Sequence, residues 1–233
     1  KLGSASKVWL NYSLEYLKKQ LNGNLIVFKG EPKECLDELI HFFDVQEISW
    51  NRCYEPWIIK RDKKLKIYLN EKIKVNSFNG SLLWEPWEIL KNDKTPYKVF
   101  TPFYKRGCLS AVKPRIPKSE KINFFNHNFR VTNISDLDLL ENKMWENEIV
   151  SQWRVGEDSS NEIMKSFFQN GVQNYSEGRN FPNKKNVSRL SPYLHWGQIS
   201  PNSIWYEVNN LKNLKHDDLE VFKSELGWRE FAY

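Results

Sequence analysis

The sequence has few cysteines and no long hydrophobic run, and these absences exclude several classes of protein. Its three cysteines, Cys35, Cys53 and Cys108, lack the spacing of a metal site, and no metal ligation is expected. An odd number of thiols in a chain of 233 residues indicates reduced cysteines in a cytosolic setting, not a disulfide framework. No apolar run reaches the length that a membrane-spanning helix needs.

The common nucleotide-binding fingerprints are absent as well. Neither Gly-x-Gly-x-x-Gly nor a P-loop occurs among the ten glycines. The composition, 40% hydrophobic and 27% charged, is that of a globular protein. A formal net charge of +6 favours an anionic partner, although a Lys-rich surface explains it equally well. Ten tryptophans and fourteen phenylalanines suit a protein that stacks on flat aromatic ligands, or one with bulky cores.

The first hundred residues alternate between helical and strand patterns. Three short strands are predicted, at Leu25–Phe28, Glu47–Trp50 and Ile73–Phe78. Helices and strands in alternation predict βαβ units on a parallel sheet, with ligands near the carboxyl ends of its strands. The helical segments are residues 6–20, the residues after Pro32, and residues 55–70.

The pattern changes in the second half of the chain. Residues 113–118 contain two prolines and predict an extended linker, and after Gly156 the pattern is helical without strands. We therefore expect an α/β domain over residues 1–105, a linker over 106–150 and an all-α domain over 151–233. Because the chain opens on a lysine and closes within a helical pattern, we interpret it as a piece of a longer protein.

Two segments of the helical part carry the most specific motifs. Residues 188–201, Ser-Arg-Leu-Ser-Pro-Tyr-Leu-His-Trp-Gly-Gln-Ile-Ser-Pro, predict a polar turn and a helix start of the kind that cradles phosphates. Further on, Glu225, Trp228 and Arg229 stand at i, i+3 and i+4 and share one helical face. A salt bridge packed on a tryptophan would explain that spacing too.

In this order and at this separation, the two segments resemble the start of the flavin-binding domain of the DNA photolyase/cryptochrome family. The resemblance covers nearly the whole chain and is weakest between residues 106 and 150. Residues 52–56, 79–83 and 97–103 resemble phrases of the family's antenna domain, and turns and packing explain most of them. The resemblance implies an α/β antenna domain with a parallel sheet, lacking its first strand. The start of an all-α FAD-binding domain would follow, without its C-terminal half.

The resemblance also assigns cofactor contacts. Residues 175–182 resemble a Tyr-x-x-x-Arg-x-x-Pro run, whose Tyr contacts FAD and whose Arg, here Arg179, faces DNA. Residues 187–191 resemble Thr-Ser-x-Leu-Ser, which binds the FAD pyrophosphate. At the first position Val187 keeps its amide but lacks the hydroxyl, which costs about 1 kcal/mol. The implied cofactor-binding residues are Tyr175, Val187, Ser188, Arg189, Leu190 and Ser191.

The resemblance implies catalytic roles for Glu225 and Trp228. The matching Glu hydrogen-bonds the damaged pyrimidines, the Trp stacks beside the flipped-out dimer, and the Arg at position 229 lies at the DNA-facing edge. A tryptophan at this position is typical of enzymes that repair cyclobutane pyrimidine dimers, whereas many cryptochromes carry another residue there. The implied DNA-binding residues are Arg179, Glu225, Trp228 and Arg229, with further phosphate contacts from Lys184, Lys185 and Arg189.

These roles imply a deoxyribodipyrimidine photo-lyase. It would repair dimers in UV-damaged DNA by electron transfer from excited, reduced FAD, with a folate or deazaflavin as a further antenna chromophore. We expect a monomeric cytoplasmic protein without a membrane partner. The sequence of residues 226–231 resembles that of a bacterial class I enzyme. Two alternatives remain open within the family: a cryptochrome that signals through a protein partner, and a (6-4) photolyase. A plain two-domain nucleotide-binding protein would explain the βαβ pattern but not residues 175–191.

Overall fold

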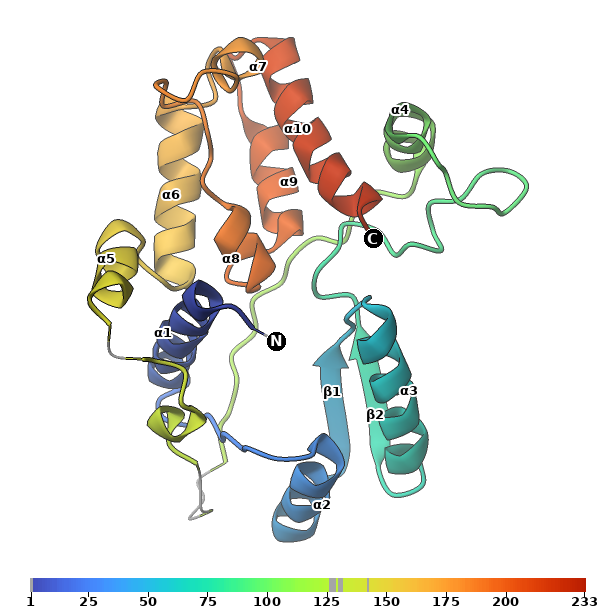
Figure 1. Ribbon diagram of the computed structural model, residues 1–233. Helices are drawn as coiled ribbons and strands as arrows, with labels where there is room; N and C mark the ends of the chain where they lie inside the picture. The colour runs from blue at the N-terminus through green and yellow to red at the C-terminus, as the bar shows by residue number, and fades with distance from the viewer. Residues whose placement is uncertain (1, 126–128, 130–131, 142) are drawn as a thin grey trace. The chain divides into compact units, whose positions relative to one another are not determined.

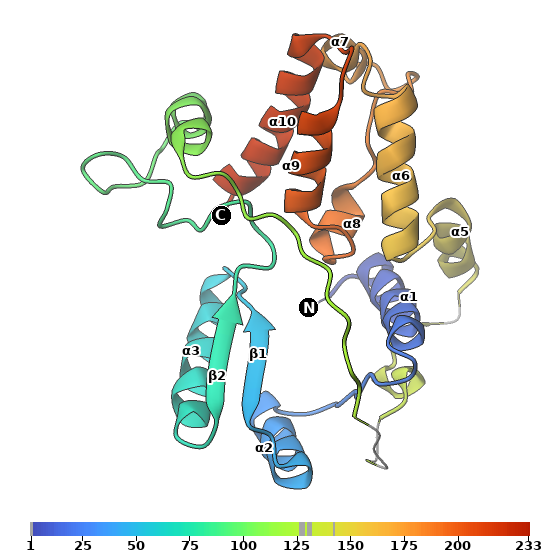
Figure 2. The same cartoon turned by 180° about the vertical axis from the view of Figure 1, so that it is seen from behind.

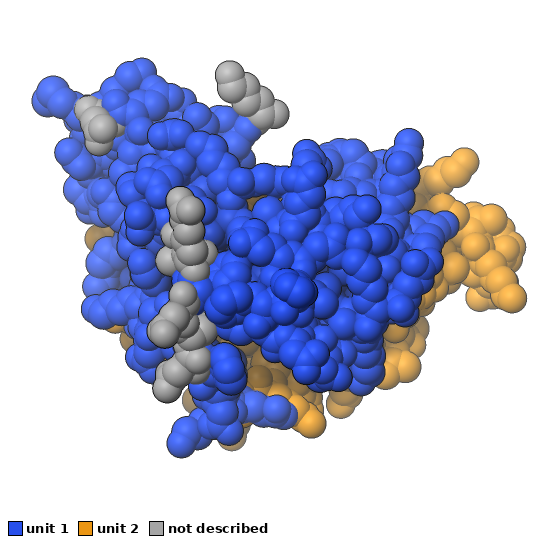
Figure 3. Space-filling view, turned by 90° about the horizontal axis from the view of Figure 1, so that it is seen from below, with its two compact units in different colours: residues 1–50, 56–77, 120–159 blue, residues 51–55, 78–119, 160–233 orange. Residues whose placement is uncertain are grey.

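The computed structural model describes residues 2–125, 129, 132–141 and 143–233. The chain divides into two compact units (Figure 3). Unit 1 contains residues 1–50, 56–77 and 120–159, and unit 2 contains residues 51–55, 78–119 and 160–233. Each unit is therefore assembled from segments that are far apart in the sequence. None of the described helices is both long enough and apolar enough to cross a membrane.

A two-stranded parallel sheet confirms the predicted βαβ unit. Strand β1 (Glu47–Asn51) pairs with β2 (Lys74–Phe78), and α3 (Pro56–Asn70) connects them (Figures 1 and 2). The exposure of β1 alternates along the strand, as expected for a strand with one covered face. Leu69 at the end of α3 and Val75 in β2 are buried.

The prediction of a strand at Leu25–Phe28 is wrong. Residues 24–29 form no helix or strand, and the carbonyl of Val27 accepts a hydrogen bond from the amide of Thr132 at 3.1 Å. Phe28 packs against the ring of Phe129 with centroids 5.6 Å apart. Residues 25–28 are only partly buried, and they are held by side-chain packing and one backbone hydrogen bond without a strand partner.

The predicted helices of unit 1 are confirmed. Helix α1 (Ser4–Gln20) buries Val8 and Trp9, and Trp9 meets Trp153 edge to face at 6.0 Å. Residues 111–125 form no helix or strand, as the two prolines predict. The other helical elements in this part are α2 (Pro32–Phe43), the 3-10 turn η3 (Ile134–Leu137) and α5 (Met144–Gln152).

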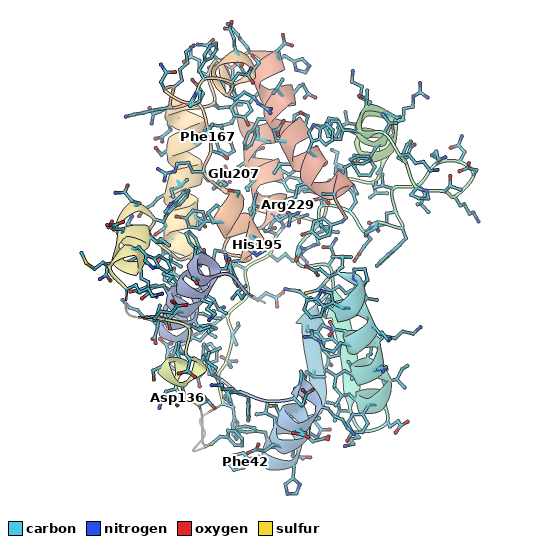
Figure 4. The ribbon with its side chains drawn as sticks, in the orientation of Figure 1. Phe42, Asp136, Phe167, His195, Glu207 and Arg229 are labelled. Atoms are coloured by element: carbon cyan, nitrogen blue, oxygen red, sulfur yellow. The ribbon has the colours of Figure 1, made fainter. Side chains whose placement is uncertain are left out.

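Residues 157–233 contain helices and no strand, which confirms the expected start of an all-α domain. Helix α9 lies between α6 and α10 in both views (Figures 1 and 2). Aromatic rings fill the space between these helices: Phe222 of α10 lies 5.0 Å from Phe167, which Figure 4 labels, and 5.4 Å from Tyr175. The helical elements are α4 (Phe100–Pro102), the π-helical turn η1 (Phe103–Gly107), the 3-10 turn η2 (Cys108–Ser110), α6 (Glu157–Asn170), α7 (Tyr175–Gly178), α8 (Ser191–His195), α9 (Pro201–Asn210) and α10 (His216–Phe231).

Candidate functional site

Helix α10 holds the short helix α7 at its first turn through Asp218. This side chain is fully buried, and its carboxylate accepts three hydrogen bonds. The amide of Asn174 donates at 2.8 Å, and Ser176 donates from its amide at 2.9 Å and from its hydroxyl at 2.7 Å. Burial raises the pKa of Asp218, but these hydrogen bonds outweigh it and hold the pKa below its ordinary value. The start of α7 is therefore fixed to α10 by an ionised carboxylate.

A second contact joins the end of α7 to α10. The guanidinium of Arg179 forms an ion pair with the carboxylate of Glu225, and the hydrogen bond between them raises the pKa of Arg179. The same guanidinium lies 5.6 Å from the centre of the Tyr175 ring. Both partners of the pair are partly exposed, at 29% and 34% of their side-chain surface. The two residues predicted to meet the substrate thus contact each other.

A cavity of about 570 Å³ brings most of the predicted site residues together. Glu225 and Arg229 line it from α10, and His195 lines it from α8; Figure 4 labels His195 and Arg229. Polar groups and apolar side chains share its wall, which suits a ligand with one polar and one flat apolar part. The remaining lining residues are Tyr175, Ser188, Leu190, Ser191, Leu194, Ile204, Phe222, Leu226, Ala232 and Tyr233.

The predicted pyrophosphate segment lies only partly on this cavity. Ser188, Leu190 and Ser191 line it, whereas Val187 and Arg189 do not, and Val187 is half exposed. Asn186 fixes the segment, because its side-chain amide donates to the carbonyls of Gly171 at 2.8 Å and Gln173 at 2.9 Å. The loop that carries the two serines is thereby tied to the turn between α6 and α7.

Trp228 lies outside the residues that line the cavity, and its ring stacks on Phe100. The two centroids are 3.8 Å apart and the planes differ by 9°. The tryptophan is nevertheless 48% exposed. Arg229, its neighbour, donates to Glu230 at 3.0 Å and lies 5.5 Å from the Tyr233 ring. The three residues predicted to share a face therefore have different partners.

Sequence reasoning grouped Glu230 with Glu225 near a basic surface and assigned it no role, whereas it is buried at the end of α10. Its Oε2 accepts hydrogen bonds from the amides of Leu83 at 2.8 Å and Trp84 at 3.3 Å. Burial raises the pKa of Glu230 to about 7, although Arg229 and the two amides lower it. The available signal was the apolar stripe of α10, because Glu230 follows Leu226 at i+4.

A second cavity in unit 2, of about 740 Å³, lies beside this glutamate's partners. The carboxylate of Glu85 accepts two hydrogen bonds in the wall of this cavity. The Nε of Arg52 donates at 3.0 Å, and the hydroxyl of Tyr54 donates at 2.7 Å. The cavity also has two cationic side chains and a tryptophan in its wall. Its lining residues are Arg52, Asn79, Leu83, Trp84, Glu85, Glu88, Ser110, Ala111, Val112, Lys113, Pro114 and Arg115.

Comparisons with known proteins identify the family to which this chain is similar. A family model described as DNA photolyase matches residues 1–120. The deoxyribodipyrimidine photo-lyase of Agrobacterium fabrum is 33% identical over an alignment that covers 100% of this chain and 50% of that protein. Cryptochrome-1 of Arabidopsis thaliana is 25% identical, with 99% of this chain and 36% of that protein covered.

Among solved structures, the bacterial class III photolyase of Agrobacterium tumefaciens has a similar fold. Its TM-score is 0.94 at 31% identity, and the match covers 99% of this chain and 49% of that one. The chain therefore spans half or less of the length of each of these relatives.

Proposed function

The chain belongs to the DNA photolyase family, and we propose that it takes part in light-driven repair of cyclobutane pyrimidine dimers in DNA. The observation that carries this proposal is the cavity of unit 2. Tyr175, Ser188, Ser191, Glu225 and Arg229 come from three separate segments and line the same space. That these residues line one cavity supports a single site for the predicted cofactor contacts and the predicted substrate carboxylate.

We expect FAD to occupy this cavity. The hydroxyls of Ser188 and Ser191 are donors suited to a pyrophosphate. Leu190, Ile204 and the other apolar residues of the wall would cover a flat ring system. Bound and reduced, FAD would supply the light-driven electron that opens the cyclobutane ring.

The residues of this chain would bind and orient the damaged DNA. A dimer inside the duplex is out of reach, so it must be extruded, and weak stacking at the lesion lowers the cost. The exposed part of Trp228 would replace the lost base stacking, worth about 1–3 kcal/mol. Glu225 would accept hydrogen bonds from the extruded bases. The cations Arg179, Lys184, Lys185, Arg189 and Arg229 would contact phosphates and make binding strongly dependent on salt.

We also propose a division of labour along the chain. Residues 1–105 would form the antenna domain, 106–150 a connection, and 151–233 the start of the FAD-binding domain. The second cavity would hold a folate or deazaflavin. Trp84 offers a stacking surface, and Lys113 and Arg115 have no carboxylate at ion-pair distance among the residues described, so they can pair with an anionic group. The wavelength dependence of repair tests this, because an antenna pigment extends it beyond that of the flavin.

A second candidate function is blue-light signalling through a protein partner. The similarity to Arabidopsis cryptochrome-1 over 99% of the chain favours it. The exposed tryptophan at position 228 favours repair instead. We assign the chain to no photolyase class. The sequence of residues 226–231 resembles that of class I enzymes, whereas the similar Agrobacterium structure is of a class III photolyase.

The decisive experiment uses the full-length, FAD-reduced protein and an oligonucleotide with one thymine dimer. We expect dimer loss under blue light but not in the dark, and a fall in repair of about 10-fold with Glu225→Gln, which removes a charged hydrogen-bond acceptor. Glu220→Gln is the matched control, because Glu220 lies on the same helix but pairs with Lys223 outside the cavity. A photoreducible flavin without any repair would contradict the proposal and favour signalling or a (6-4) activity.

A further inference from the structure

Trp228 is the outermost of three stacked aromatic rings. Phe100 lies face to face with it, with centroids 3.8 Å apart and planes 9° apart. Tyr104 continues the stack behind Phe100, at 5.6 Å and 10°. All three rings belong to unit 2, but the first comes from α10 and the other two from residues 100–104. The stack therefore joins two segments that are more than a hundred residues apart in sequence.

A glycine in α10 makes this stack possible. A Cβ atom at Gly227 would lie 2.4 Å from Cδ2 of Tyr104 and 2.8 Å from Cε2. Tyr104 is buried, and its hydroxyl has no hydrogen-bond partner among the described residues, so ring packing holds it there. Glycine inside a helix costs about 1 kcal/mol relative to alanine. The close approach of Tyr104 to α10 is the physical reason for a glycine at this position.

The stack leaves Trp228 with one available face. Phe100 covers one face of the indole, and Phe231 meets both rings edge-on, at 5.9 Å from each. The tryptophan is still 48% exposed, so a base has room to stack on the other side. A ring supported in this way loses little conformational freedom when a base binds.

We propose that Phe100 is a positioning residue for lesion recognition: it supports Trp228 from behind, so that the free face of the indole is preorganised for an extruded pyrimidine. This inference rests on the proposed function, because it assigns a cause to the stacking role of Trp228. Phe100 acts through Trp228 and touches no substrate itself.

Phe100→Leu is the sharpest test, because leucine keeps an apolar side chain but removes the flat ring. In the full-length, FAD-loaded protein we expect it to weaken binding of an oligonucleotide with one thymine dimer by about 3- to 10-fold. Binding of the undamaged oligonucleotide stays unchanged, and Phe100→Tyr, which keeps the ring, restores lesion affinity. Phe103→Leu is the control: Phe103 lies in the same segment and packs on Phe231 at 5.1 Å and on Tyr97, but not on Trp228.

A double-mutant cycle with Trp228→Ala separates this inference from the proposed function. We expect Phe100→Leu to have no further effect once Trp228 is removed. If Trp228→Ala weakens lesion binding and Phe100→Leu does not, only the role of Phe100 is wrong. If neither variant weakens it, the proposed role of Trp228 fails as well. A loss caused by Phe100→Leu that persists without Trp228, or that is equal for undamaged DNA, also overturns the positioning role.

Discussion

The two ends of α10 each carry a buried carboxylate, and their pKa values move in opposite directions. Asp218 and Glu230 lie on the same apolar stripe as Phe222 and Leu226, at successive i+4 positions. Both accept hydrogen bonds from backbone amides of a segment distant in sequence. The pKa of Asp218 nevertheless lies below its ordinary value, while that of Glu230 is raised to about 7.

The difference shows that burial alone does not decide the charge state of a carboxylate. Burial raises the pKa of both groups. Asp218 stands in the first turn of α10, where the helix dipole favours an anion, and a hydroxyl adds a third hydrogen bond. Glu230 stands in the last turn, where the dipole disfavours an anion, and the neighbouring Arg229 compensates only in part.

The two ends of α10 therefore bind different segments, and the charge of each end depends differently on pH. Asp218 stays ionised at neutral pH and fixes the turn that carries Tyr175 and Arg179. Glu230 titrates near neutral pH and holds the amides of Leu83 and Trp84, which line the second cavity. The end of α10 that holds α7 therefore stays charged at neutral pH, and the end that carries Glu230 is sensitive to pH.

The largest expected effect comes from Asp218→Asn. The asparagine NH2 group would face the buried N–H of Asn174 and leave it unpaired, and the asparagine carbonyl would accept only weaker, uncharged hydrogen bonds from Ser176. Together these changes lower the free energy of unfolding by about 4 kcal/mol. Chemical denaturation of the full-length protein at pH 7 measures this. Asp217→Asn, an exposed neighbour in the same helical turn, is the matched control and loses under about 1 kcal/mol. Equal losses in the two variants would show that the hydrogen bonds to α7 contribute nothing.

The next effect is a pH dependence at the other end of α10. The folded state keeps a proton on Glu230 up to about pH 7, whereas the unfolded chain releases it near the ordinary value of 4.5. The folded state binds more protons between these values, so its stability falls as pH rises through them, by on the order of 3 kcal/mol. Glu230→Gln removes this slope. The unfolding free energies of both proteins, measured from pH 5 to pH 8, give the difference.

The pH dependence of stability that Asp218 causes has the opposite sign. Its pKa is lowered, so its contribution is complete above the ordinary value of 3.8 and is lost as pH falls below it. Asp218→Asn should therefore leave the slope between pH 5 and pH 8 unchanged. A slope that disappears with Asp218→Asn, or survives Glu230→Gln, would contradict the assignment of the titrating group.

The sequence predicted helix α10 but not the burial of its carboxylates Asp218 and Glu230. Helical periodicity identified Leu219, Phe222 and Leu226 as one stripe, because apolar side chains indicate their own burial. An acidic residue on such a stripe needs donors from another segment, and no local pattern identifies Asn174 or Leu83 as those donors. The predicted strand at residues 25–28 failed for a related reason, because a short apolar run says nothing of which segment it pairs with.

The candidate site was predictable to a similar extent. The resemblance identified Tyr175, Ser188 and Glu225, and the structure brings all three to one cavity. It gave residues 97–103 a packing role, but the stacking of Phe100 on Trp228 depends on the close approach of Tyr104 to Gly227. Such an approach is a tertiary distance, which the spacing of residues along one helix does not contain.

The smallest predicted effect tests how the three hydrogen bonds at Asp218 share their contribution. Ser176→Ala removes the hydroxyl that donates to Oδ1 at 2.7 Å but keeps the amide that donates to the same oxygen at 2.9 Å. We expect a loss of about 1 kcal/mol in unfolding free energy, since the carboxylate keeps two donors. Combined with Asp218→Asn, Ser176→Ala should add less than it does alone, because the asparagine carbonyl accepts only a weaker, uncharged hydrogen bond from that hydroxyl. Full additivity of the two losses in that double variant would mean that Ser176 stabilises the start of α7 independently of α10. The hydrogen bonds to Asp218 would then not explain how this end of α10 holds α7.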